Sequence, residues 1–166
     1  IIDGGVTAAK GFKAAGMHAG IKKGTKKDMA MIVSSAPCMA AGTFTTNLVK
    51  AAPVKWDQHV VYEHGEARAV VVNSGIANAC TGAEGYGYCE ETAKAAAEAL
   101  GIDKDEVLVA STGVIGKQLP IDTIKKGVKD LSGLLLDTRE AATLAAESIM
   151  TTDTVKKEVA VEVEIG

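Results

Sequence analysis

The stretch Glu106–Gly116, EVLVASTGVIG, joins a short apolar run to a Ser-Thr-Gly loop. Residues 106–110 predict a strand because the run is short, apolar and rich in valine. The loop leads toward Pro120, and proline favours the first position of a helix. A strand that passes through a glycine-containing loop into a helix is typical of α/β proteins, which often carry their chemistry at such loops. The stretch therefore predicts both the fold class and the place of a site.

The Ser-Thr-Gly loop carries groups that can stabilise negative charge. Glycine lets the backbone approach a ligand closely, and a hydroxyl and a backbone N–H beside it can both point at a developing oxyanion. We therefore expect Thr112 and Gly113 to supply two such donors. The same residues also fit an ordinary turn between a strand and a helix. No obvious nucleophile and base stand beside them, so we expect those groups from another segment or another chain.

Predicted strands alternate with predicted helices along the rest of the chain. The run 68–73 holds three consecutive valines and is expected to be a central strand, buried on both faces. Residues 87–100 are rich in alanine and predict a helix, with Glu90 and Lys94 one turn apart and Gly101 placed to end it. The glycine-rich segment 4–24 predicts turns and short extended pieces.

Further elements complete the prediction. Additional strands are expected at 29–34, 41–46 and 159–165. Three additional helices are also expected: a short one capped by Asn47 that ends at Pro53, one that starts at Pro120, and one capped by Asp137 and Glu140. In the last strand, valine and isoleucine alternate with glutamate, which predicts one buried face and an antiparallel part of the sheet. The fold class is therefore α/β, with a layered mixed sheet packed against helices; a doubly wound sheet is the alternative.

Composition narrows the classes of protein that fit this chain. Its 166 residues, 47% of them hydrophobic, are expected to form one domain, residues 1–166. The net charge of -3 shows no block of one sign, and the basic run Lys22–Lys27 is interpreted as a solvated turn, so no nucleic-acid partner is expected. No metal or cofactor is predicted, because the histidines and cysteines lack ligand spacing.

Location is predicted from the cysteines and from hydropathy. Cys38, Cys80 and Cys89 are an odd number without metal-type spacing, which favours reduced, structural thiols. No apolar run is long enough to span a bilayer, and the N-terminus lacks the pattern of a signal peptide. We therefore expect a cytoplasmic protein without a membrane partner.

A second group of hydroxyls lies near the C-terminus. Thr151, Thr152 and Thr154 surround one carboxylate, Asp153, directly after a predicted helix. Such a group can bind the polar end of a small substrate. It can equally be a turn at the end of a helix, making local hydrogen bonds.

Several segments, taken together and in order, resemble the ornithine acetyltransferase family, the glutamate N-acetyltransferases of arginine biosynthesis, and specifically its N-terminal α chain. These segments are Gly5–Ala8 with Gly11–Gly16, Thr43–Asn47 followed by Ala51–Val54, Asn73–Ala79, Ser111–Gly116 and Met150–Thr154. Any one of them would be a weak signal, whereas five in order over essentially the whole chain are specific.

The resemblance implies a two-chain enzyme. Family members cleave themselves before a threonine in a Met-Ala-Thr-Met-Leu motif, and that threonine becomes the nucleophile of a β chain that stays associated, here expected as an α2β2 assembly. No such motif occurs in residues 1–166, so the nucleophile is expected on a partner chain. A family lysine that binds substrate is expected in the α-chain tail outside this sequence.

The resemblance also implies a reaction and roles for three residues. The partner's threonine would take the acetyl group from N-acetylornithine and pass it to glutamate; some members also use acetyl-coenzyme A as the donor. Thr112 and Gly113 match the family's oxyanion donors, and Thr151 matches a threonine that binds substrate. Two alternatives remain open: a related aminopeptidase or hydrolase with an N-terminal nucleophile, and a non-catalytic module that binds a small molecule.

Overall fold

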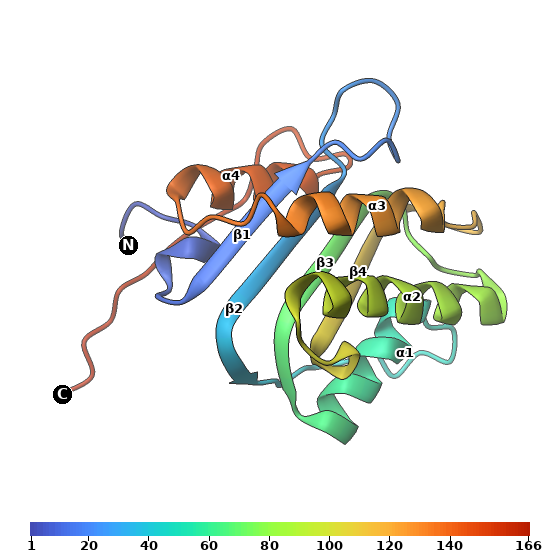
Figure 1. The fold of residues 1–166 in the computed structure, drawn as a ribbon, viewed down its shortest axis with the longest axis horizontal. Coiled ribbons are helices and arrows are strands. Elements are labelled where there is room, and N and C mark those ends of the chain that lie inside the picture. The colour runs from blue at the N-terminus through green and yellow to red at the C-terminus, as the bar shows by residue number, and fades with distance from the viewer.

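The computed structural model describes all residues 1–166 and contains one mixed four-stranded sheet (Figure 1). Its strands are β1 (Phe12–Met17), β2 (Met29–Met39), β3 (Glu66–Ile76) and β4 (Val107–Val114), in the spatial order β1-β2-β3-β4. The pairs β1–β2 and β2–β3 are antiparallel, whereas β3 and β4 are parallel. The prediction of a mixed sheet is confirmed.

Helices lie on both faces of the sheet. Helices α2 (Gly82–Leu100) and α3 (Ile121–Ser132) pack together over one face, and α4 (Arg139–Ser148) packs on the other face, against β1 and β2 (Figure 1). Helix α1 (Ala52–His59) runs into a π-helical turn (Val60–His64) and lies beside β4. Helices therefore sit on both sides of one sheet, as the layered α/β class requires.

The larger part of the core fills the space between the sheet and helices α2 and α3. Met29 and Met31 of β2 are completely buried in it, because alternate residues of a strand point to the same face. Helix α3 adds an apolar stripe of four residues at helical spacing. Ile121 is partly buried, and the other three are fully buried: Ile124, Val128 and Leu131. The helical period of these residues thus decides which side of α3 faces the sheet.

The opposite face is packed with small side chains. A separate cluster joins alanines of β1 and β2 to alanines of α4: Ala14, Ala30, Ala141 and Ala145. At Gly16 a Cβ atom would lie 2.2 Å from the carbonyl oxygen of Leu144, so α4 approaches β1 closely only because Gly16 has no side chain. Small side chains thus allow α4 and the sheet to pack closely together.

Helix α1 protects the outer edge of β4 with two side chains. The indole N–H of Trp56 donates to the carbonyl oxygen of Val107 at 2.8 Å, and the backbone N–H of Val109 donates to the carboxylate of Asp57 at 2.9 Å. These contacts satisfy groups that an edge strand otherwise leaves unpaired. Burial raises the pKa of Asp57 from its usual 3.8 to about 6, partly offset by the hydrogen bond from Val109.

Replacing Asp57 by asparagine is expected to increase stability above about pH 6. The folded protein holds this carboxyl protonated to a higher pH than the unfolded chain does, so its ionisation lowers stability as the pH rises from about 4 to 6. An asparagine oxygen still accepts from the N–H of Val109. The rise in the pKa of Asp57 sets an upper limit of about 3 kcal/mol on the gain in folding stability. Thermal unfolding of both proteins across this range tests it; a Tm difference that does not grow with pH contradicts the expectation.

Most predicted elements are present, with longer bounds. The strands predicted at 29–34, 68–73 and 106–110 and the helices predicted at 87–100 and after Pro120 are confirmed. Gly101 adopts a left-handed conformation with φ of 68° and ends α2, and Glu90 pairs with Lys94 at 3.0 Å. The segment 4–24 holds one regular strand, β1, between turns.

Four details predicted from the sequence, in the segment 41–53 and directly before α4, are wrong. Residues 41–46 form no strand, and Asn47 caps no helix; its side chain accepts from the N–H of Val49 in a local turn. Pro53 lies in the first turn of α1, where its missing N–H costs nothing, and therefore begins that helix. The cap of α4 is Thr138, whose hydroxyl accepts from Ala141, and not Asp137.

The strand predicted at 159–165 is also wrong. Only Ala160 makes a bridge, to Ile2, and the alternating apolar residues are exposed: Val159, Val161, Val163 and Ile165. A period of two shows that one face can be buried, but a strand also needs a free sheet edge. Within this chain the outer edge of β1 pairs with Leu136 and that of β4 is covered by α1.

Candidate active site

The parallel strands β3 and β4 end side by side, and the predicted oxyanion donors lie at this end. Ser74 is opposite Thr112 in the register, and Gly75 is opposite Gly113. Gly113 has φ of 132°, and a Cβ atom there would lie 2.3 Å from the carbonyl carbon of Gly75. Both features require glycine, so the close approach of the two strand ends depends on this residue.

Buried polar contacts fix the backbone beneath these donors. The hydroxyl of Ser111 donates to the side-chain oxygen of Asn73 at 2.6 Å, and the amide of Asn73 donates to the carbonyl oxygen of Ile76 at 2.9 Å. The hydroxyl of Ser74 donates to the carbonyl oxygen of Ser148 at the end of α4. The last contact connects the strand ends to the segment that follows α4.

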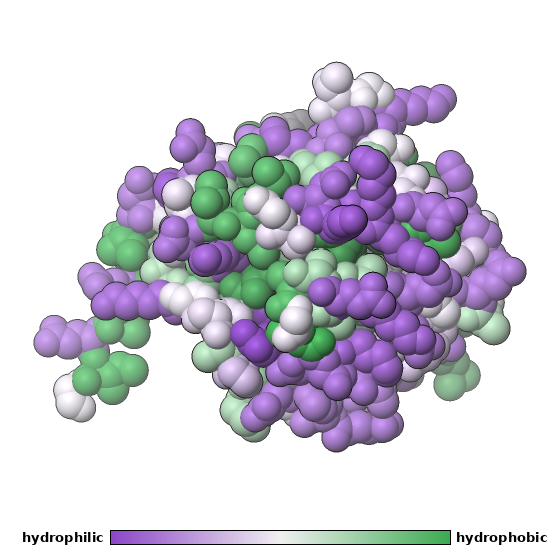
Figure 2. Space-filling model, in the orientation of Figure 1, coloured by the Kyte–Doolittle hydropathy of each residue, from purple (hydrophilic) through white to green (hydrophobic).

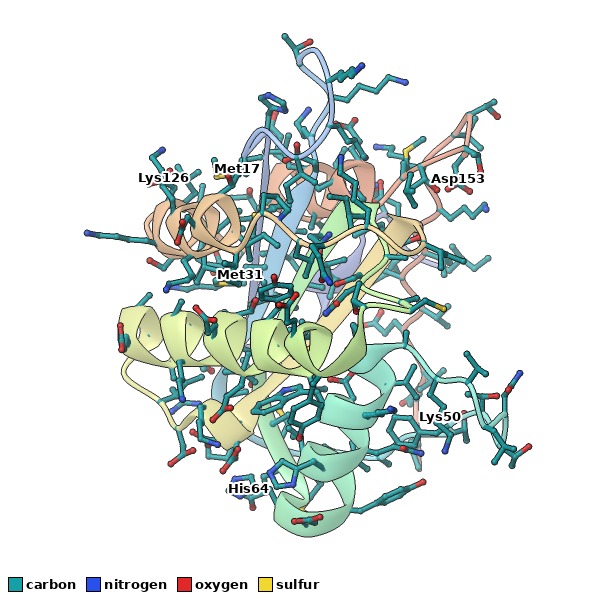
Figure 3. The ribbon with its side chains drawn as sticks, turned by 90° about the vertical axis from the view of Figure 1, so that its right-hand side faces the viewer. Met17, Met31, Lys50, His64, Lys126 and Asp153 are labelled. Atoms are coloured by element: carbon teal, nitrogen blue, oxygen red, sulfur yellow. The ribbon has the colours of Figure 1, made fainter.

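An open cavity of about 450 Å³ brings the three predicted site residues together. It is lined by Thr112, Gly113 and Thr151, and by Lys22, Lys26, Gly75, Val114 and Thr152. Thr112 is half-buried, whereas Gly113 and Thr151 are exposed. Asp153 lies on the outer loop at the same end of the molecule, far from His64 at the opposite end (Figure 3). The cavity can therefore present hydroxyls, a backbone N–H and two ammonium groups to one ligand.

Two lysines line this cavity although their sequence context did not predict it. The composition of the run Lys22–Lys27 favours a solvated turn, but Lys22 and Lys26 line the cavity. Completely buried Asp28 organises this loop, because its carboxylate accepts from four successive backbone N–H groups at 2.6 to 3.2 Å: Ala19, Gly20, Ile21 and Lys22. One acidic residue directly after a basic run is the only signal of this arrangement in the sequence.

Asn78 lies in another of the segments that resemble the family, but its side chain bonds within the protein core and does not reach the cavity. It is fully buried in a left-handed conformation, with φ of 48°, and its amide donates to the carbonyl oxygen of Gly85 and to Cys89. Thr81 donates to its side-chain oxygen at 2.8 Å. This part of the Asn73–Ala79 segment therefore fixes the start of α2 and does not line the cavity.

The cysteines and the glycine-rich segment 82–87 also lie outside the cavity. All three cysteines are free, and burial raises the pKa of Cys89 to about 12, so this thiol is unreactive near neutral pH. Residues 82–87 belong to the first turns of α2. No group of three histidine, cysteine or acidic side chains is arranged to hold a metal ion, and no helix is long and apolar enough to cross a membrane.

Comparison with known proteins assigns the chain to a family. The ArgJ family model matches residues 13–166. The arginine biosynthesis bifunctional protein ArgJ of Gloeobacter violaceus is 52% identical over 165 residues, which are 99% of this chain and 40% of that protein. The chloroplastic protein of the same name from Zea mays is 44% identical over 99% of this chain and 36% of its own length. The chain thus spans about two fifths of the length of such relatives.

Solved structures agree with this assignment. Ornithine acetyltransferase from Mycobacterium tuberculosis, determined with ornithine, has a TM-score of 0.89 and 45% identity, covering 93% of this chain and 83% of that one. The arginine biosynthesis bifunctional protein from Bacillus halodurans has a TM-score of 0.87 and 44% identity, covering 92% and 78%. On sequence and fold together, this chain belongs to the ArgJ family, as its resemblance to the ornithine acetyltransferases predicted.

Proposed function

We propose that this chain is the α chain of an enzyme that transfers an acetyl group from N-acetylornithine to glutamate in arginine biosynthesis. The observation that carries the proposal is the meeting of Thr112, Gly113 and Thr151 in one cavity. Relatives covering almost all of this chain are named for arginine biosynthesis and ornithine acetyltransferase, which supports the reaction class. The proposed roles rest on the chemistry of these groups.

In the proposed first step, the N-terminal threonine of the β chain attacks the acetyl carbonyl of N-acetylornithine. The α-amino group of that threonine takes the hydroxyl proton, and the carbonyl oxygen becomes negatively charged. The hydroxyl of Thr112 and the backbone N–H of Gly113 donate to this oxygen, while Thr151 binds the substrate. The C–N bond then breaks, the proton passes to the departing amine, and ornithine leaves an acetyl-threonine ester.

In the proposed second step, the amino group of glutamate attacks this ester. The same two donors stabilise the second tetrahedral intermediate, because its oxyanion forms at the same carbonyl. The threonine hydroxyl is restored and N-acetylglutamate is released. The two half-reactions give ping-pong kinetics, with no cofactor in either of them.

The partner in this proposal is a β chain from the same precursor, in an α2β2 assembly. Exposed apolar surface on this chain supports a covering partner. Leu134 and Leu136, in the connection from α3 to α4, are 52% and 56% exposed. Figure 2 shows the side of the molecule seen in Figure 1. Hydrophobic side chains gather there over β1 and β2, whereas the part over α2 is mainly hydrophilic. The exposed valines and isoleucine of the segment 159–165 add further apolar side chains.

An acetyl-transfer assay of the protein produced from its full-length gene tests the proposal. We expect N-acetylglutamate and ornithine to form in equal amounts from N-acetylornithine and glutamate. Acetyl-coenzyme A in place of N-acetylornithine tests the second donor. Release of acetate without transfer would support the hydrolase alternative, and the absence of any turnover would support the non-catalytic binding module.

A further inference from the structure

Lys22 lies at the candidate site with its side chain half-buried. Two hydrogen bonds orient its ammonium group, and no carboxylate pairs with it. The side chain lines the cavity that holds Thr112 and Thr151. A Cβ atom at Gly75 would lie 3.2 Å from Cγ of Lys22, so the lysine stem passes directly over the end of β3. Gly75 in turn lies opposite Gly113. The stem, the strand end and the proposed oxyanion donor are therefore contiguous.

The backbone that carries Lys22 is held in place by Asp28. Four consecutive N–H groups, the last being that of Lys22 itself at 2.8 Å, converge on this fully buried carboxylate. His18 lies beside it, with Nδ1 3.4 Å from one carboxylate oxygen. The negative charge of Asp28 is thus used to shape the loop. It forms no ion pair with the ammonium of Lys22.

The ammonium of Lys22 is oriented by neutral groups and retains a free donor. It donates to the carbonyl oxygen of Lys27 at 3.0 Å and to that of Met150, the residue before Thr151. An ammonium has three N–H donors, so one remains after these two bonds. No carboxylate lies within ion-pair distance of it, although the half-buried ammonium groups of Lys27 and Lys104 each have one.

An unpaired cation in this position is electrostatically unfavourable until an anion arrives. Burial lowers the pKa of Lys22, an effect that Asp28 partly reverses and the neighbouring charge of Lys26 adds to. Lys26 is exposed, lines the same cavity and also has no acidic partner. Two positive charges therefore face one cavity whose other polar groups are hydroxyls and the backbone of Gly113. Both lysines also line an adjoining cavity with Glu147 and Asp153, but these carboxylates pair with Lys27 and Lys157 instead. A carboxylate is the complementary charge and can accept from both kinds of donor.

We propose that Lys22 binds the α-carboxylate of the amino-acid substrate in the cavity formed with Thr112, Gly113 and Thr151. The proposal rests on the proposed function for the identity of the substrate. It assigns Lys22 to binding and Asp28 to positioning, because Asp28 acts only through the loop. Lys26 strengthens the positive potential at the entrance and makes no specific contact.

Binding of a matched ligand pair tests the proposal directly. The ligands are N-acetylornithine and its carboxamide, which lacks the negative charge, and the readout is the Kd from calorimetry on the full-length gene product. We expect the wild type to prefer the carboxylate by about 10- to 100-fold, and Lys22→Gln to lose most of that preference. Lys22→Arg should retain it. The control is Lys23→Gln, an exposed neighbour that does not line the cavity.

Each result decides the matter. If Lys22→Gln weakens both ligands equally, Lys22 only shapes the loop and the proposal is overturned. Equal Kd values for the two ligands in the wild type overturn it too, even if acetyl transfer occurs. A wild type that shows the preference but no transfer contradicts the proposed function and leaves this inference standing.

A measurement on the unaltered protein covers the case in which Lys22→Gln does not fold. The rate of Lys22 modification by an amine-reactive reagent is followed by peptide mass spectrometry, with Lys23 as the internal reference. N-acetylornithine should slow the reaction at Lys22 several-fold and its carboxamide should not. Equal protection by both ligands, or by neither, overturns the proposal.

Discussion

Replacing Thr112 by alanine is expected to slow acetyl transfer by about 10²-fold while leaving folding and assembly intact. The hydroxyl of Thr112 makes no hydrogen bond to another residue of this chain, although it lies half-buried in the cavity. Its removal therefore leaves no partner unsatisfied within the chain, and the loss falls on the transition state. The expected decrease is in kcat, with KM for N-acetylornithine changed much less.

Thr112→Ser is the matched control because it keeps the hydroxyl. We expect it to retain most of the activity, whereas alanine does not. Single-turnover formation of the acetyl-enzyme, measured beside circular dichroism and thermal unfolding, separates chemistry from folding. Full activity in a folded Thr112→Ala protein would remove this residue from the oxyanion site.

Replacing Gly113 by alanine is expected to have a larger effect, because it damages both the site and the fold. The new Cβ atom would lie 2.3 Å from the carbonyl carbon of Gly75 and 2.7 Å from the backbone nitrogen of Ile76. Backbone atoms cannot rotate away as a flexible side chain can, so β3 and β4 must separate at their ends. The φ of 132° adds strain for any residue with a side chain.

We expect Gly113→Ala to lower stability by about 3 kcal/mol or more and acetyl transfer by more than about 10²-fold. Gly116→Ala is the control, because Gly116 also has a positive φ, of 76°, but a Cβ atom added there would have nothing within 4 Å. That variant should lose only about 1 kcal/mol, the usual penalty of a left-handed conformation. Equal Tm values for the two variants would show that the contact with Gly75 is not the cause.

Local sequence patterns correctly predicted the helices and strands whose formation depends mainly on residues close together in the sequence. Helix α3 follows from Pro120 and the helical spacing of Ile124, Val128 and Leu131, and β3 follows from its consecutive valines. Residues 159–165 have an equally regular pattern, yet they form no strand, because pairing depends on an edge elsewhere in the fold. Periodicity specifies which face can be buried and leaves the partner unspecified.

The site was predictable only in part, for a similar reason. The proposed donors Thr112 and Gly113 lie in one loop of the sequence, but their proximity to Thr151 arises from tertiary contacts, among them that of Ser74 with the end of α4. The lysines were missed because a basic run on a loop has the same composition whether it is solvated or folded toward a cavity. What distinguishes the two is the set of four N–H groups bound by Asp28, which no local pattern encodes.

The most direct test of the account is the intact mass of every chain in the full-length gene product, before and after incubation with N-acetylornithine alone. We predict two chains, and a gain of one acetyl group on the chain that begins with threonine, reversed when glutamate is added. The chain described here should keep its mass throughout. An acetyl group on this chain, or transfer to glutamate without any acetylated chain, would contradict the account.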